Sequence, residues 1–99
     1  MTTKNKAVNT LHNNTEGIRS YGVKKIGIFG SFVRAAQNNK SDIDVLVEFK
    51  KLEKSFDNYM DLKFYLEKLF HRRVDLVIIE ALKPRIRQHI LKEVIYARI

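Results

Sequence analysis

Hydrophobic residues recur along this chain with two different periods, and each period predicts a different kind of element. Residues 42–49 alternate with period two, which is typical of a strand with one buried face. Residues 23–29 (VKKIGIF) and 74–79 (VDLVII) are short runs rich in β-branched and aromatic residues, and they predict two further strands. The sequence therefore indicates at least three strands.

Helical spacing separates these strands. A weak amphipathic helix is expected over residues 5–21, a short helical segment over 32–36, a helix over 57–70 capped by Ser55 or Asp57, and a last helix with Pro84 in its first turn. A polar loop is expected at residues 37–40. The inward-facing residues of the helices would be Ala7, Leu11, Ile18, Leu62, Leu66, Leu69, Phe70, Ile86, Ile90, Val94 and Ala97. This order predicts an α+β fold with a small mixed sheet of three or slightly more strands and helices packed on one face.

Length and composition narrow the class of protein. With 99 residues, the chain is expected to form one domain over residues 1–99, with residues 1–5 flexible. No apolar run reaches the roughly 18 residues of a membrane span, and residues 1–10 lack the apolar core of a signal peptide, so no membrane association and a cytoplasmic location are expected. The absence of cysteine excludes disulfides, iron–sulfur clusters and thiolate zinc sites.

The formal net charge of +8 has two interpretations. It favours anionic partners such as a nucleotide, a nucleic acid or an acidic protein surface, or it is simply a well-solvated basic surface. Because the lysines and arginines are scattered and form no five-residue run, direct nucleic-acid binding is not expected.

Three carboxylates are the strongest candidates for chemistry. Asp42 and Asp44 are two residues apart on a predicted strand, so they share a face with Cα atoms about 6.5 Å apart. Asp75 lies inside an apolar strand, where Val74 and Leu76 would face the core and leave Asp75 on the other side. If the two strands are neighbours, the three acids meet and would bind a hard cation, Mg²⁺ or Mn²⁺. The alternative for each acid alone is a cap, a solvated side chain, or an ion pair between Asp75 and Arg72 or Arg73.

The dipeptide Gly30-Ser31 stands where a strand is expected to pass into a helix. Glycine lets a ligand approach the backbone, a helix N-terminus offers N–H groups to phosphate, and the Ser31 hydroxyl adds a donor. A plain helix cap is the alternative. The chain has neither the P-loop pattern nor G-x-G-x-x-G.

The stretch from Gly30-Ser31 through Arg34, followed by residues 41–47 (SDIDVLV), closely resembles the signature of the DNA polymerase β-like nucleotidyltransferases. With residues 73–77 (RVDLV) and the small size, the chain resembles the minimal nucleotidyltransferase family, the antitoxin partners of HEPN-domain ribonuclease toxins. The resemblance implies a nucleotidyltransferase fold. It also implies that Gly30 and Ser31 hold the triphosphate of ATP, and that Asp42, Asp44 and Asp75 are catalytic residues that bind two Mg²⁺ ions.

Arg34 is left with two roles, contact with phosphate or support of the loop. The chain departs from the family pattern at two positions, since Ala35 and His71 stand where the family usually has glycine. Ala35 would be strained only if that position needs a positive φ, and His71 is interpreted as a helix C-cap rather than a ligand.

The resemblance further implies AMP transfer from ATP to a hydroxyl, a tyrosine by analogy with family antitoxins, of a HEPN-domain toxin. Two alternatives remain open. One is an antitoxin that neutralises its toxin by binding alone, and the other is a nucleotidyltransferase that acts on a small molecule.

Overall fold

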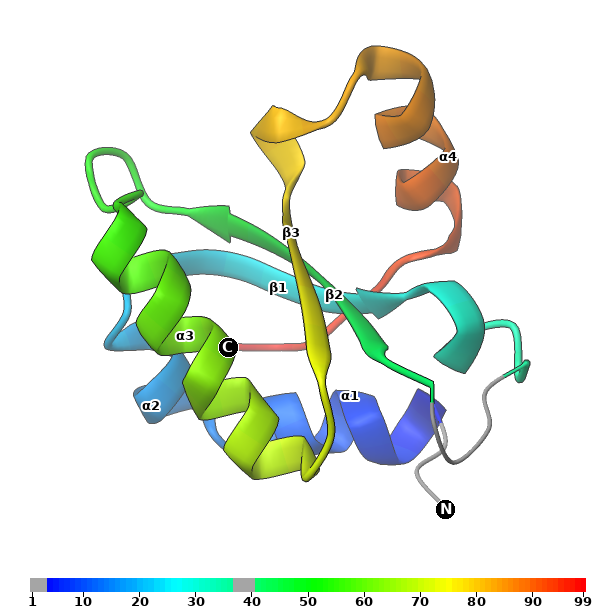
Figure 1. Ribbon diagram of the computed structural model, residues 1–99, viewed down its shortest axis with the longest axis horizontal. Coiled ribbons are helices and arrows are strands. Elements are labelled where there is room, and N and C mark those ends of the chain that lie inside the picture. Colours follow the sequence, from blue (N-terminus) through cyan, green and yellow to red (C-terminus); the bar gives the residue numbers. More distant parts are fainter. Residues whose placement is uncertain (1–3, 37–40) are drawn as a thin grey trace.

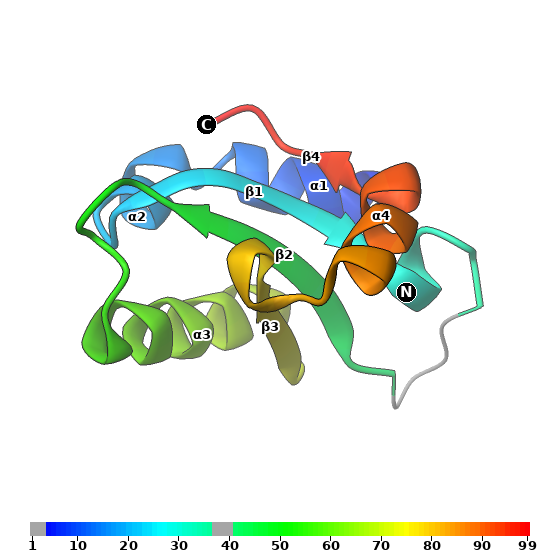
Figure 2. The same ribbon diagram turned by 90° about the horizontal axis from the view of Figure 1, so that it is seen from above.

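The computed structural model describes residues 4–36 and 41–99. Its sheet has four strands in the order β3-β2-β1-β4. The first three are labelled in Figure 1, and β4 is labelled in Figure 2. Strand β1 (Val23–Phe29) pairs antiparallel with β2 (Ile43–Phe49), and β2 pairs parallel with β3 (Val74–Ile78). A short β4 (Ile95–Tyr96) pairs antiparallel with the other edge of β1. The sheet is therefore mixed, as the sequence predicts, with one more strand than the three hydrophobic runs.

Three helices cover one face of this sheet: α1 (Lys4–His12), α2 (Thr15–Arg19) and α3 (Phe56–Phe70). Their buried residues join those of the strands, and Phe32 from the turn after β1, in one core: Ala7, Leu11, Ile18, Leu62, Leu66, Phe70, Val23, Ile26, Ile28, Phe32, Ile43, Val45, Val47, Phe49, Val74 and Leu76. The odd-numbered residues of β2 face this core, and Asp44 and Glu48 face away, as period two requires. The fourth helix, α4 (Pro84–Glu93), has no buried residue and lies apart from the other three (Figure 2).

Local chemistry sets the ends of α3. The Ser55 hydroxyl accepts a hydrogen bond from the Asn58 amide at 3.1 Å, so Ser55 rather than Asp57 is the N-cap. His71 ends the helix in the left-handed region, with φ 54° and ψ 38°, which confirms it as the C-cap. Only Arg72 and Arg73 separate His71 from β3, in which Asp75 is the second residue.

Three sequence predictions are wrong in detail. Residues 5–21 form two helices, because the backbone turns at Asn13 and Asn14. Residues 32–36 form no α-helix: a single 3₁₀ turn, η1 (Gly30–Phe32), is followed by turns in which Ala35 has φ 57°. The Ile86, Ile90, Val94 and Ala97 stripe is not a helical core face, since α4 ends at Glu93 and Ile86 is 49% exposed.

The C-terminal error has a physical cause. Val94 takes extended dihedral angles, and the backbone then joins the free edge of β1, where Tyr96 pairs with Gly27 and Ile95 with Ile28. A two-residue strand has no period of its own, so only its partner reveals it. A second short 3₁₀ turn, η2 (Ile79–Ala81), ends the third predicted strand one residue early.

The expected loop at residues 37–40 and the flexibility expected of residues 1–3 lie outside the described residues, whereas Lys4 and Asn5 already belong to α1. Among the helices of the described segments, none has the length and apolar character needed to cross a membrane.

Candidate active site

The register of the sheet brings two of the predicted acids together. In the parallel ladder of β2 and β3, Asp44 is the direct partner of Asp75. Their chain neighbours Ile43, Val45, Val74 and Leu76 are buried, so both carboxylates lie on the face away from the main core. The prediction that the strands carrying these acids are neighbours is confirmed for Asp44 and Asp75.

The environment of Asp44 disfavours its charged form. Burial raises the pKa of this carboxyl most, and the charge of Asp75, a hydrogen bond with Asp75 and the charge of Asp42 raise it further. A hydrogen bond from the Ser31 amide acts in the opposite direction, and the resulting pKa is about 6. A partly buried carboxylate whose charged form is further disfavoured by a neighbouring acid is a place where a cation would be stabilised.

Asp42 is less closely integrated. It lies one residue before β2 and is exposed, and its charge is the weakest of the influences that raise the Asp44 pKa. Within residues 4–36 and 41–99, no three Asp, Glu, His or Cys side chains are grouped closely enough to hold a metal ion as they stand. The structure thus pairs Asp44 with Asp75, while Asp42 would have to turn inward to complete a three-carboxylate site.

The Gly30-Ser31 turn packs directly against Asp44. Phe29, the last residue of β1, pairs with Asp44 across the sheet, and Gly30 follows with φ 75°. A Cβ at Gly30 would overlap the Asp44 carboxylate and lie 2.9 Å from its Cγ atom. Glycine is therefore required here both by the backbone and by the close approach of the acid.

The support of this turn includes a residue that sequence reasoning missed. The Gly30 amide donates a hydrogen bond of 2.9 Å to Oε1 of Glu93, the last residue of α4. Arg34 donates to both oxygens of the same carboxylate, at 3.1 and 3.0 Å. These bonds are consistent with support of the loop by Arg34, and its contact with phosphate stays a prediction. No local pattern could identify Glu93, because it is 63 residues from Gly30 in the chain.

Side-chain hydrogen bonds also fix the backbone on either side of the acids. Arg72 donates to the Ser41 carbonyl oxygen at 2.8 Å and lies over the Phe32 ring at 5.2 Å from its centroid, which ties the segment before Asp42 to the turn. From α3, the Tyr59 hydroxyl donates to the Leu76 carbonyl oxygen at 2.6 Å, and Glu67 accepts from the Val74 amide at 3.0 Å. These two bonds occupy the outer edge of β3 on either side of Asp75. Burial raises the Tyr59 pKa, and the charge of Asp75 raises it further.

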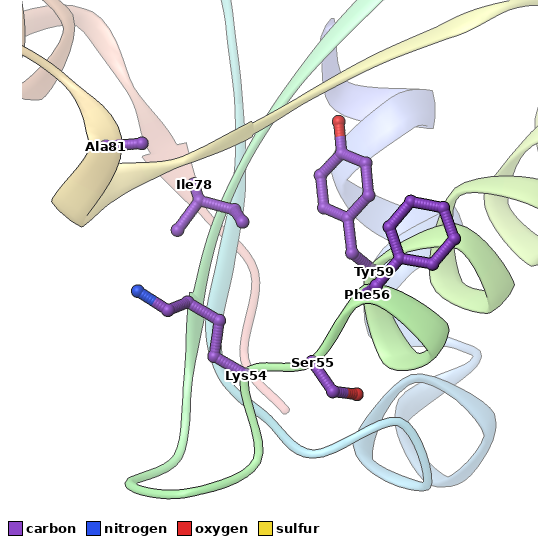
Figure 3. Close-up of a pocket in the computed structure, with 6 residues that line it drawn as sticks. All are labelled: Lys54, Ser55, Phe56, Tyr59, Ile78 and Ala81. Atoms are coloured by element: carbon purple, nitrogen blue, oxygen red, sulfur yellow. The ribbon is translucent and has the colours of Figure 1, made fainter.

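A largely apolar hollow of about 390 Å³ opens at the other end of β3. It is lined by Lys54, Ser55, Phe56, Tyr59, Ile78 and Ala81, and the Tyr59 ring stands between α3 and β3 (Figure 3). The acids and the Gly-Ser turn do not line it. We therefore place the carboxylate and turn site on the opposite face of the sheet, not in this hollow.

A mixed sheet that presents paired carboxylates beside a Gly-Ser turn is the arrangement that the resemblance to the nucleotidyltransferases implies. Residues 5–98 match the model of the family described as "Polymerase beta, Nucleotidyltransferase", and the chain belongs to this family. It is 43% identical over 76 residues to the protein adenylyltransferase MntA of Thermococcus cleftensis, covering 77% of this chain and 76% of that protein.

Solved structures agree. One assigned as a minimal nucleotidyltransferase superposes with a TM-score of 0.73 at 34% identity, over 89% of this chain and 93% of that one. A toxin–antitoxin complex with AMP-PNP has a chain of the same fold, with a TM-score of 0.69 at 20% identity over 86% of this chain and 70% of that one. The resemblance to the minimal nucleotidyltransferase family is confirmed.

Proposed function

We propose that this chain is a protein adenylyltransferase that moves AMP from ATP to a tyrosine hydroxyl of a HEPN-domain ribonuclease toxin, and so acts in the cytoplasm as its antitoxin. The observation that carries the proposal is the pairing of Asp44 with Asp75 directly beside the Gly30-Ser31 turn. The similarity to a protein adenylyltransferase supports a protein as the acceptor. A solved complex of a HEPN toxin with an MNT antitoxin contains a chain of the same fold, which supports a HEPN toxin as the acceptor protein.

The residues of the site fit a divalent cation in their chemistry. Asp42, Asp44 and Asp75 offer only carboxylate oxygens, the ligands that Mg²⁺ and Mn²⁺ prefer. Burial raises the pKa of Asp44 most and the charge of Asp75 raises it further, so a cation beside the pair would favour the ionised form. With Asp42 turned inward toward the paired Asp44 and Asp75, these three residues would hold two Mg²⁺ ions together with ATP. When bound, the ions neutralise charge on the attacking and leaving oxygens.

The other tasks belong to the chain itself. Gly30 and Ser31 bind the triphosphate, through backbone approach and the Ser31 hydroxyl, and orient it for in-line displacement. Asp75 is exposed at an edge strand, where a hydroxyl carried by a large partner can reach it and lose its proton. The acceptor oxygen then forms a bond to the α-phosphorus, the bond from that phosphorus to the bridging oxygen breaks, and pyrophosphate leaves.

The openness of this face favours a protein over a small acceptor. Asp42 and Asp75 are both exposed, and the hollow under β3 is not part of the site. A small molecule would need walls that bury most of its surface, whereas a folded partner supplies its own docking surface.

The Asp75→Asn variant tests the proposal, because it keeps size and removes the charge on the acceptor side. With the HEPN toxin, ATP and Mg²⁺, the wild type should add adenylyl groups to the toxin as seen by intact mass. Asp75→Asn should transfer at least about 10²-fold more slowly, as for loss of a positioned catalytic base. Asp61→Asn, at another exposed aspartate, should match the wild type.

Sequestration predicts a different result. If the folded Asp75→Asn protein still protects cells as well as the wild type at limiting expression, the antitoxin works by binding alone, and the enzymatic proposal is wrong. Equal transfer rates in EDTA and in Mg²⁺ would refute the role of the carboxylates as metal ligands.

A further inference from the structure

The Gly-Ser turn is held from two directions by two carboxylates that come from distant parts of the chain. The Gly30 amide donates to Glu93 at 2.9 Å, and the next amide, that of Ser31, donates to Asp44. We infer that Glu93 is a positioning residue for nucleotide binding, which orients the Gly30 peptide for the triphosphate. This inference rests on the proposed function of the turn.

The pair of hydrogen bonds fixes the orientation of the turn. Two successive N–H groups with different acceptors leave little freedom for the peptide plane between them. Inside the turn, the Val33 and Arg34 amides both donate to the Gly30 carbonyl oxygen, at 3.0 and 3.1 Å. Gly30 is thus held through its amide, its carbonyl oxygen and its contact with Asp44, all at φ 75°. Loss of the Glu93 side chain would leave the Gly30 amide without its acceptor, while the other two contacts of Gly30 remain.

The positive charge of Arg34 explains why a glutamate can lie next to a triphosphate site. An unpaired carboxylate would repel the nucleotide, but the Arg34 guanidinium bonds both oxygens of Glu93 at 3.0–3.1 Å. The Glu93 side chain is 23% exposed and that of Arg34 is 58% exposed, so the pair is partly shielded from solvent. Arg34 therefore balances the charge while Oε1 remains an acceptor for Gly30.

Glu93 also ends α4, which has no buried residue of its own. A purely structural role, in which Glu93 merely ties down α4, is therefore the competing explanation. It predicts lower thermal stability without a specific effect on nucleotide affinity. The positioning role predicts that affinity changes even where stability does not.

Three variants separate these roles. Glu93→Ala removes the acceptor, Glu93→Gln keeps a carbonyl oxygen for the Gly30 amide but loses the charge, and Arg34→Met removes the charge partner alone. A matched control is Glu48→Ala, because Glu48 pairs with Lys24 at 3.4 Å with similar exposures of 27% and 57%. Each protein is compared by thermal midpoint, by calorimetric Kd for Mg-ATP and by hydrogen exchange at the Gly30 amide.

We expect Glu93→Ala to weaken Mg-ATP binding by about tenfold or more, the loss associated with a charge-assisted hydrogen bond. Exchange at Gly30 should quicken in the same variant. Glu93→Gln should recover most of the affinity and protection, and Glu48→Ala should bind as the wild type does.

Several results would overturn the inference. Unchanged affinity in Glu93→Ala would leave Glu93 a structural tie, and tighter binding would show that it competes with phosphate. Equal losses in Glu93→Gln and Glu93→Ala would assign the effect to charge rather than to the Gly30 hydrogen bond. If the wild type itself binds no Mg-ATP, the proposed function fails, and exchange at Gly30 alone then shows whether Glu93 holds the turn.

Discussion

Replacement of Gly30 by alanine should separate the stability of the nucleotide turn from its function. Gly30 has φ 75°, a conformation that costs a residue with a Cβ about 1–2 kcal/mol. The new Cβ would also overlap the Asp44 carboxylate and lie 2.9 Å from Cγ and 3.1 Å from Cβ of that residue. Asp44 must therefore move away from its position beside Asp75.

The magnitude follows from these two terms. Backbone strain of about 1–2 kcal/mol and roughly 1 kcal/mol for the displaced, off-rotamer acid suggest a loss of about 2–3 kcal/mol in the free energy of unfolding. For a domain of this length, each kcal/mol corresponds to roughly 4–8 °C in thermal midpoint.

Gly22 provides the matched control. It has φ 82°, and a Cβ there would lie 2.5 Å from the Cβ of Glu53, away from the candidate site. Gly22→Ala should therefore destabilise the fold by a similar amount. Only Gly30→Ala moves Asp44, so only this variant should lose Mg-ATP binding and AMP transfer, both measured well below the lower of the two thermal midpoints.

The reasoning is refuted if folded Gly30→Ala binds Mg-ATP and transfers AMP like the wild type. It is also refuted if Gly22→Ala loses binding to the same degree, because the effect would then follow stability and not the position of Asp44.

Three further predictions follow from the same geometry. Ser31→Ala should lower kcat/KM for ATP, by an amount that corresponds to a loss of about 1.5–3 kcal/mol in transition-state stabilisation. It should lower the free energy of unfolding by only about 1 kcal/mol. An unchanged kcat/KM would show that Ser31 is only a cap. Because the folded protein raises the Asp44 pKa from 3.8 to about 6, it binds this proton more tightly than the unfolded chain does, so the Asp44 contribution to stability falls as pH rises from 3.8 to about 6. In EDTA the thermal midpoint of Asp44→Asn should decline less over this range than that of the wild type, and parallel curves would contradict the shift. Ala35→Gly should stabilise the protein by about 0.5–1 kcal/mol, since φ is 57° there, and chemical denaturation that shows no gain would argue against strain.

Much of the candidate site could be predicted from local patterns. Period two in residues 42–49 places Asp44 opposite the buried Ile43 and Val45, and the apolar neighbours of Asp75 do the same for that acid. The face that each side chain occupies depends only on the pleat of its own strand. His71 could likewise be interpreted as a C-cap because the capping geometry is local.

Other features depend on contacts that no local pattern encodes. The parallel register that sets Asp44 beside Asp75 joins strands separated by all of α3, and the β4 strand exists only because β1 has a free edge. The sequence did not determine whether Ala35 has a positive φ, because both a left-handed and a helical conformation are compatible with the polar connection between β1 and β2.

Glu93 shows this limit most clearly. In the sequence it is one acid at the end of an amphipathic helix, and nothing in its neighbours distinguishes it from a solvated residue. The fold brings it to the Gly30 amide and to Arg34, 63 and 59 residues away in the chain. The sequence alone determined which residues could face the site, because side-chain direction follows from the backbone period. The tertiary structure decided which of them meet, because hydrogen bonds between distant residues form only after the helices and strands have packed.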